Sequence, residues 1–259
     1  LAATGRQNTN YPWAELPLHF LLIQNWGLTE ALTWNDPAWS ISTELAAYLL
    51  FPFVVAAARW EKLSGFALAL IAASQLAVLH LLFALNGETG LGAEISRLGL
   101  WRCLLEFSLG NVLCIVWSRY GERRHFAAAA ALACAASLVG GMALSLPETA
   151  FVPFAFASGL LALAADRGAA ARMLGKGALQ YLGEISYSTY LGHFLLFILF
   201  KLAFVDDSLQ LGWLGLAGFL TLMLAASAAL YHGVEKPAQR WLNRHPPRLP
   251  LRSRAVPAE

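Results

Sequence analysis

Seven apolar stretches of roughly 20 residues constrain the fold of this chain more than any other feature. They run approximately over residues 38–58, 65–85, 98–118, 126–146, 149–165, 181–203 and 211–234. About 20 apolar residues in a helix cross the hydrocarbon core of a bilayer, which is about 30 Å thick. Inside that core a helix satisfies its own backbone polar groups. The sequence therefore predicts an all-α, polytopic transmembrane helix bundle.

The composition excludes the common alternatives. Of the 259 residues, 58% are hydrophobic and 13% are charged, whereas an ordinary soluble domain has about 25% charged residues. The low charge and high hydrophobicity also exclude intrinsic disorder. Cys103, Cys114 and Cys134 lie within apolar stretches and have neither a disulfide pattern nor a metal-ligand spacing. We expect no metal, no resident cofactor and no nucleic-acid partner.

The basic residues predict the orientation of the spans. When the loops are assigned alternately to two sides, 14 of the 18 Lys and Arg residues fall on one side. Arg6, Arg97 and Lys201 fall on the other side, and Arg102 lies within a span. Because basic loops stay in the cytoplasm, we expect a multi-pass protein with residue 1 outside and the C-terminus in the cytoplasm.

Three regions follow from this topology. Residues 1–37 form an extracytoplasmic segment with a short interfacial or re-entrant helix, and residues 38–236 form the transmembrane part. Pro237 is expected to stop the last helix, because proline cannot continue one. Residues 237–259 then form a basic, Pro-rich cytoplasmic tail, expected to be irregular and to contact anionic lipid.

Few ionisable side chains lie inside the predicted spans, where each costs at least about 2.5 kcal/mol and so needs a partner, a water-filled cavity or a task. Glu44, Arg102 and Glu106 lie roughly 6 to 12 Å below the outer boundary at 1.5 Å rise per residue, so they can share one layer. Arg102 and Glu106 are four residues apart and could simply neutralise each other. Glu44 has no opposite charge on its own helix, so it would either be protonated or pair with Arg102.

Two spans also have a polar face. The faces comprise Ser40, Glu44 and Tyr48 in the first span, and Ser186, Tyr190 and His193 in the sixth. Such faces point toward protein or water. His193 could equally be a structural donor between helices. His80 has no polar residue at helical spacing and is interpreted as structural.

No single motif in the sequence specifies a chemistry. The chain has no G-x-S-x-G elbow, no H-E-x-x-H zinc helix, no P-loop and no H-x-x-x-x-D pair. Any catalysis must therefore use residues brought together from different helices. Polar groups near the middle of a membrane also suit a transporter of a polar solute, although the sequence has no inverted repeat to support that alternative.

Four stretches resemble the signatures of the membrane acyltransferase 3 family, which comprises bacterial multi-span proteins that O-acylate sugars and other acceptors. Residues 34–52, WNDPAWSISTELAAYLLFP, are similar to W-S-(I/L)-S-x-E-x-x-(F/Y)-Y-L-L-F-P. Residues 102–110, RCLLEFSLG, resemble the arginine-bearing helix of the family. Residues 182–195, LGEISYSTYLGHFL, resemble L-G-x-I-S-Y-x-x-Y-L-x-H, and residues 235–237 resemble the E-x-P that closes the last helix.

The resemblance implies an O-acyltransferase of the bacterial inner (plasma) membrane. Such an enzyme moves an acyl group, usually acetyl, from a cytoplasmic acyl-CoA co-substrate to a hydroxyl of an extracytoplasmic glycan or similar acceptor. Members typically have ten spans, and seven are predicted here. We therefore expect three further helices before Leu1, with the catalytic histidine and the R-x-x-R acyl-CoA motif of the family, and activity would depend on them.

The resemblance also implies roles for individual residues. Because a hydroxyl needs a general base to attack an acyl carbonyl, Glu44 or Glu106 would orient the histidine base. Arg102 would hold a carboxylate or bind an anionic group. Substrate contacts are expected from Trp39, Ser40, Ser42, Tyr48, Ser186, Tyr187, Tyr190, His193 and Glu235. Glu235 could instead serve the helix end by pairing with Lys236 or Arg240.

Overall fold

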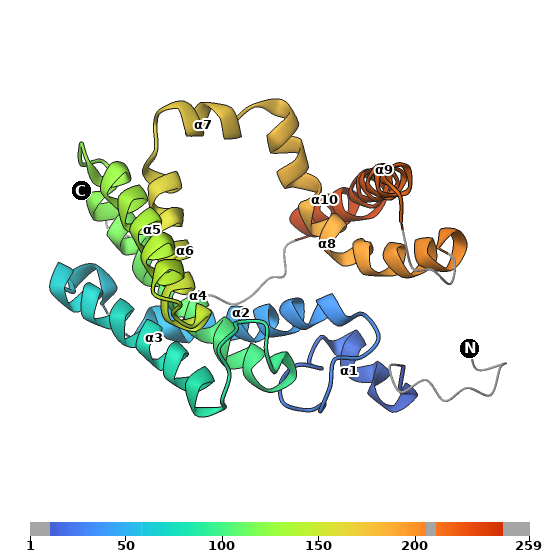
Figure 1. Cartoon of the computed structure of the whole chain (residues 1–259), viewed down its shortest axis with the longest axis horizontal. Helices are drawn as coiled ribbons and strands as arrows, with labels where there is room; N and C mark the ends of the chain where they lie inside the picture. Colours follow the sequence, from blue (N-terminus) through green and yellow to red (C-terminus); the bar gives the residue numbers. More distant parts are fainter. Residues whose placement is uncertain (1–10, 58, 206–210, 246–259) are drawn as a thin grey trace. The chain divides into compact units, whose positions relative to one another are not determined.

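The structure, a computed structural model, describes residues 11–57, 59–205 and 211–245. Every regular element in these ranges is helical (Figure 1). Seven of the described helices are long and apolar enough to cross a membrane, as the sequence predicts. The chain divides into two compact units, Leu1–Leu179 and Gln180–Glu259.

The first unit contains five of the long helices. After α1 (Leu16–Leu21) come α2 (Trp39–Ala57), α3 (Gly65–Leu85), α4 (Ile95–Tyr120), α5 (Phe126–Ala143), α6 (Glu148–Ala165) and the short α7 (Ala169–Leu174). Helix α8 (Gly177–Phe204) begins at the end of this unit. The second unit contains the rest of α8, then α9 (Trp213–Leu230), a π-helical segment (Tyr231–Glu235) and α10 (Lys236–Arg244).

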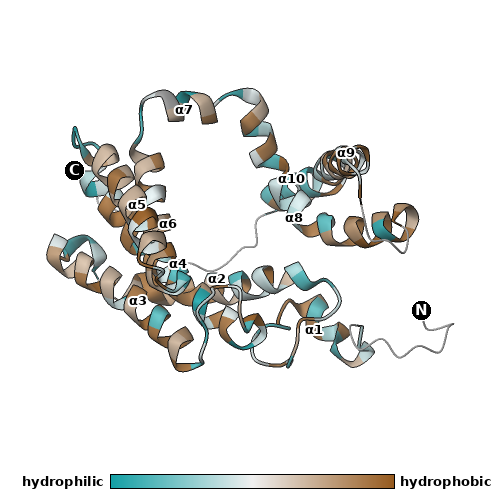
Figure 2. Ribbon diagram, in the orientation of Figure 1, coloured by the Kyte–Doolittle hydropathy of each residue, from teal (hydrophilic) through white to brown (hydrophobic). Residues whose placement is uncertain are grey.

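Helix α4 lies at the centre of the first unit. It packs against α2, α3 and α6, and α5 pairs with α6. The buried core is formed by Leu79 and Phe83 of α3, Leu98 of α4 and Leu91 of the connection between them. Many large apolar side chains on the long helices are exposed. Figure 2 shows how the hydrophobic residues are distributed along these helices. This is typical of helices that face hydrocarbon on one side.

A small residue brings α5 and α6 close together. A Cβ at Gly141 would collide with the ring of Phe151, so the backbones approach more closely than a larger residue would allow. The Ser137 hydroxyl donates a hydrogen bond to the Phe151 carbonyl at 3.1 Å in the same contact. Small residues and hydroxyl bonds of this kind are typical of helix pairs in membranes.

The last helical stretch continues through Pro237, so the expectation that this proline ends it is wrong. The chain passes from α9 through the π-helical segment into α10, with Pro237 in the first turn of α10. Proline is tolerated in a first turn, where its missing N–H has no helical partner in any case. Residues 237–244 are therefore helical and not irregular, while residues 246–259 lie outside the described part of the chain.

Candidate functional site

Helices α2 and α4 pack side by side and bring three predicted site residues together. Glu44 comes from α2, and Arg102 and Glu106 come from α4. All three side chains interact electrostatically with the thiol of Cys103, and Glu44 also interacts with the phenol of Tyr48. The three charged groups therefore lie near Cys103, where α2 packs against α4.

Arg102 bonds to groups on α4 and on the connection between α3 and α4. Its Nε donates a hydrogen bond to Glu106 Oε1 at 3.0 Å, and its Nη1 donates to the Leu91 carbonyl at 2.9 Å. Among the residues that the structure describes, no ion pair reaches Glu44, whose side chain is exposed. Of the two carboxylates, Glu44 is therefore the one without a cationic partner in the described chain.

Tyr48 is placed by aromatic packing between the same helices. Its ring meets Phe107 of α4 edge to face at 5.9 Å between centroids, and the ring of Phe51 also meets Phe107 edge to face, at 5.8 Å. Thr43 of α2 also lies close to the thiol of Cys103 of α4. Sequence reasoning missed Thr43, Cys103 and Phe107, because nothing in their own helices distinguishes them from packing residues.

The predicted binding residues at the start of α2 hold the N-terminal segment in place. Ser42 is fully buried and accepts a hydrogen bond from the backbone N–H of Asn25 at 3.1 Å. The Asn25 amide donates in turn to the Ile95 carbonyl of α4 at 3.1 Å. The Ser40 hydroxyl donates to the Pro37 carbonyl at 3.3 Å, and the ring of Trp39 lies beside Gly99 of α4. In this structure the Ser42 hydroxyl serves the fold.

A hydrogen-bonded chain of side chains lies in the segment before α2. Thr33 donates its hydroxyl proton to Glu15 Oε2 at 2.7 Å, so it accepts from His19 Nε2 at 3.0 Å. Burial lowers the pKa of His19, while the carboxylates of Glu15 and Asp36 oppose that shift. The sequence signal that would have found this chain is the i, i+4 spacing of Glu15 and His19.

His80 has a partner on another helix. Its Nδ1 lies 2.9 Å from the Thr149 hydroxyl of α6. The contact joins α3 to α6, in agreement with the structural interpretation of this histidine.

In the second unit, the predicted polar face of α8 places a histidine in a defined tautomer. His193 Nδ1 lies 2.6 Å from the Tyr190 carbonyl, and the two rings are in contact at 5.7 Å. Because a carbonyl oxygen only accepts, Nδ1 must carry the proton. In the neutral ring, the lone pair then lies on Nε2.

The opposite face of α8 binds the end of α9 and the π-helical segment. Tyr231 donates its hydroxyl to Glu184 at 3.1 Å, and Ser188 donates to Glu235 at 2.5 Å. Tyr181 and His232 are hydrogen-bonded at 3.1 Å. Residues 181, 184 and 188 follow an i, i+3, i+7 spacing that sequence reasoning passed over.

Glu235 therefore does not join the other predicted binding residues of α8. At 3.6 residues per turn, Ser186, Tyr190 and His193 point roughly opposite to Glu184 and Ser188. Within the described chain, Glu235 also has no ion pair with Lys236 or Arg240, the alternative raised by the sequence. Its second oxygen accepts from Gln239 at 3.1 Å.

No group of three or more His, Cys, Asp or Glu side chains in the described ranges is arranged to hold a metal ion. A family model described as an acyltransferase domain matches residues 3–232. The chain belongs to the acyltransferase 3 family.

One similar curated relative is the acyltransferase MdmB of Streptomyces mycarofaciens. The two are 29% identical over 263 residues, which cover 91% of this chain and 66% of the relative. The chain thus spans 66% of the length of that relative. No solved structure matches this chain. The family match includes the α2, α4 and α8 residues described above and ends three residues before Glu235.

Proposed function

We propose that this family member transfers an acyl group, usually acetyl, from a cytoplasmic acyl-CoA to a hydroxyl of an extracytoplasmic glycan or similar acceptor. The observation that carries this proposal is the meeting of Glu44, Arg102 and Glu106 between α2 and α4. The proposed setting is the bacterial inner membrane, with the basic loops and the C-terminus in the cytoplasm.

The reaction requires a base close to the acceptor. The hydroxyl oxygen attacks the thioester carbonyl, its proton passes to a base, and the C–S bond breaks to release the CoA thiol after protonation. Glu106 is already bound by Arg102 at 3.0 Å. Glu44 is therefore the carboxylate proposed to orient the base or to receive the proton, and Glu106 is proposed as a positioning residue for Arg102.

Arg102 is suited to stabilise negative charge during the reaction. Its guanidinium has N–H groups beyond those that reach Glu106 and Leu91. Donors aimed at the developing oxyanion lower the barrier to acyl transfer. We assign that role, or the binding of an anionic group, to Arg102.

His193 and the polar face of α8 are proposed to contact substrate. The proton on Nδ1 is held by the Tyr190 carbonyl, so Nε2 of the neutral ring is the nitrogen available to accept a hydrogen bond. Ser186 and Tyr187 are proposed to contact substrate on the same helix. Glu235 is removed from this set, because it bonds to Ser188 on the opposite face.

The test is acyl transfer from labelled acetyl-CoA in membranes that contain the protein. We expect Glu44→Gln to lower the rate by about 100-fold or more, the usual contribution of a positioned acid or base. Glu94→Gln is the matched control, because Glu94 pairs with Arg97 at 3.6 Å outside the α2–α4 site. Unchanged turnover in Glu44→Gln would contradict the proposal. Solute flux without acyl transfer or acetyl-CoA hydrolysis would favour a transporter instead.

A further inference from the structure

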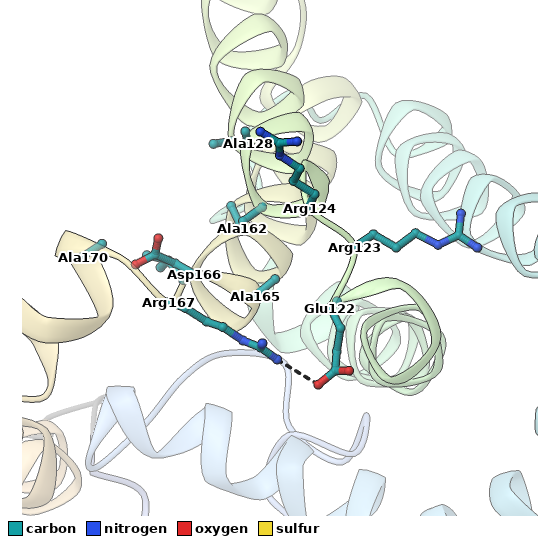
Figure 3. A pocket seen from close by; sticks show the side chains of 13 residues that line it. Glu122, Arg123, Arg124, Ala128, Ala162, Ala165, Asp166, Arg167 and Ala170 are labelled. Atoms are coloured by element: carbon teal, nitrogen blue, oxygen red, sulfur yellow. Dashed lines mark hydrogen bonds and ion pairs between the residues drawn. The ribbon is translucent and has the colours of Figure 1, made fainter.

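A pocket of about 520 Å³ lies in the first unit, at the ends of α4, α5 and α6 (Figure 3). Its wall combines the connection Gly121–Arg124, one face of α5, and the end of α6 with the loop that follows. On the α5 side the lining consists of Ala127, Ala128 and Ala131. Small side chains leave this space open, and it is far larger than the ~30 Å³ share of a single water molecule.

Most charged side chains around the pocket already have partners. Glu122 and Arg167 form an ion pair at 2.9 Å. Asp166 accepts a hydrogen bond from the backbone N–H of Ala171 at 2.7 Å. The guanidinium of Arg123 lies over the Tyr120 ring at 4.5 Å, and Figure 3 shows it reaching away from the alanines.

Arg124 is the exception in this lining. Within the described ranges it has no ion pair or hydrogen bond, and Figure 3 shows its side chain lying along α5 beside Ala128. The three arginines exceed the two acids, so the lining carries a net positive charge. The pocket thus offers a free guanidinium beside open space.

The start of α5 strengthens the positive potential in the same place. This helix begins at Phe126, and its N-cap residue His125 forms no side-chain capping bond. The first N–H groups of a helix and its dipole favour a negative charge at that end. Arg124 and the helix start therefore act in the same direction on a ligand in the pocket.

We propose that this pocket binds a phosphate group. Guanidinium and phosphate match in geometry and charge, and the alanine lining leaves room for the group to approach. The basic connections put the pocket at the predicted cytoplasmic end of the helices, where anionic headgroups and soluble phosphate esters both have access. This site is separate from the α2–α4 carboxylates and does not depend on the proposed acyl transfer.

The experiment is a titration of the purified full chain in a neutral detergent, with the shift in thermal midpoint as the readout of binding. The probes are dihexanoylphosphatidylglycerol, its phosphate-free counterpart dihexanoylglycerol, and glycerol 3-phosphate. We expect saturable stabilisation by a phosphate-bearing probe and none by dihexanoylglycerol. Stabilisation by the lipid alone identifies a headgroup as the source, and stabilisation by glycerol 3-phosphate identifies soluble phosphate as sufficient.

Two variants and a matched control test the residues. Arg124→Ala should weaken phosphate binding by about fivefold, as expected for one basic residue near an anionic group. Ala131→Leu fills the pocket without a change in charge and should weaken binding too. Arg172→Ala removes the same charge from α7, outside the lining, and should have a smaller effect. Equal effects of Arg124→Ala and Arg172→Ala, or no saturable binding of either phosphate probe, would overturn the proposal.

Discussion

Replacing Arg102 with alanine measures how much its contacts with Glu106 and Leu91 contribute to the free energy of unfolding. Arg102 donates to Glu106 at 3.0 Å and to the Leu91 carbonyl at 2.9 Å. A hydrogen bond to a charged group contributes about 1.5–3 kcal/mol when shielded from solvent. The Arg102 and Glu106 side chains are 24% and 38% exposed, which reduces the contribution of the ion pair. We expect Arg102→Ala to lower the free energy of unfolding by about 2 kcal/mol.

A double-mutant cycle separates the two contacts. Reversible unfolding in mixed detergent micelles would be measured for Arg102→Ala, Glu106→Gln and the double variant, and we expect a coupling of about 1 kcal/mol. The exposed pair of Glu94 and Arg97, at 3.6 Å, is the control and should couple by about 0.3 kcal/mol. A coupling at Arg102 no larger than this control would refute the reasoning.

Two further predictions concern stability. Gly141→Leu should lower the free energy of unfolding by about 1–3 kcal/mol through overpacking, because a side chain there meets Phe151. Gly140→Leu is the control and should cost less, because the space at its Cβ is open. Equal losses in detergent unfolding would contradict the close α5–α6 contact at Gly141. Burial lowers the pKa of His19 below its usual 6.5, so the unfolded chain binds the proton more readily, and stability should fall as pH drops below that value. His19→Gln should flatten the thermal midpoint between pH 7.5 and 5 relative to the native chain, and an unchanged slope would count against this role.

The pattern along each helix allowed much of the architecture to be predicted. Length and apolarity decide whether a segment spans a bilayer, and both are local properties. All seven spans were predicted, and the i, i+4 spacing of Arg102 and Glu106 made their ion pair one of the two alternatives for Arg102. Pro237 was misread because the rule that proline ends a helix ignores the helix restart after a π-helical segment.

The candidate site was predictable only within each helix. Glu44 and Arg102 were expected to share a layer, and the packing of α2 on α4 brings both near Cys103, which no sequence pattern distinguishes from a packing residue. Sequence reasoning also grouped Glu235 with His193, although the two lie on different faces. His193 is part of the polar face of α8, whereas Glu235 bonds to Ser188 on the opposite face of that helix.

By itself, the sequence determined that the chain forms membrane-spanning helices and which polar residues share a face, because periodicity and hydropathy are fixed by order along the chain. Only the tertiary structure decided which carboxylate is engaged by Arg102 and which helix receives Glu235. It also left Arg124 beside an open pocket. Partners across helices depend on how the helices are rotated and packed against one another. A step of one residue along a helix turns the side chain by about 100°, because one turn has 3.6 residues.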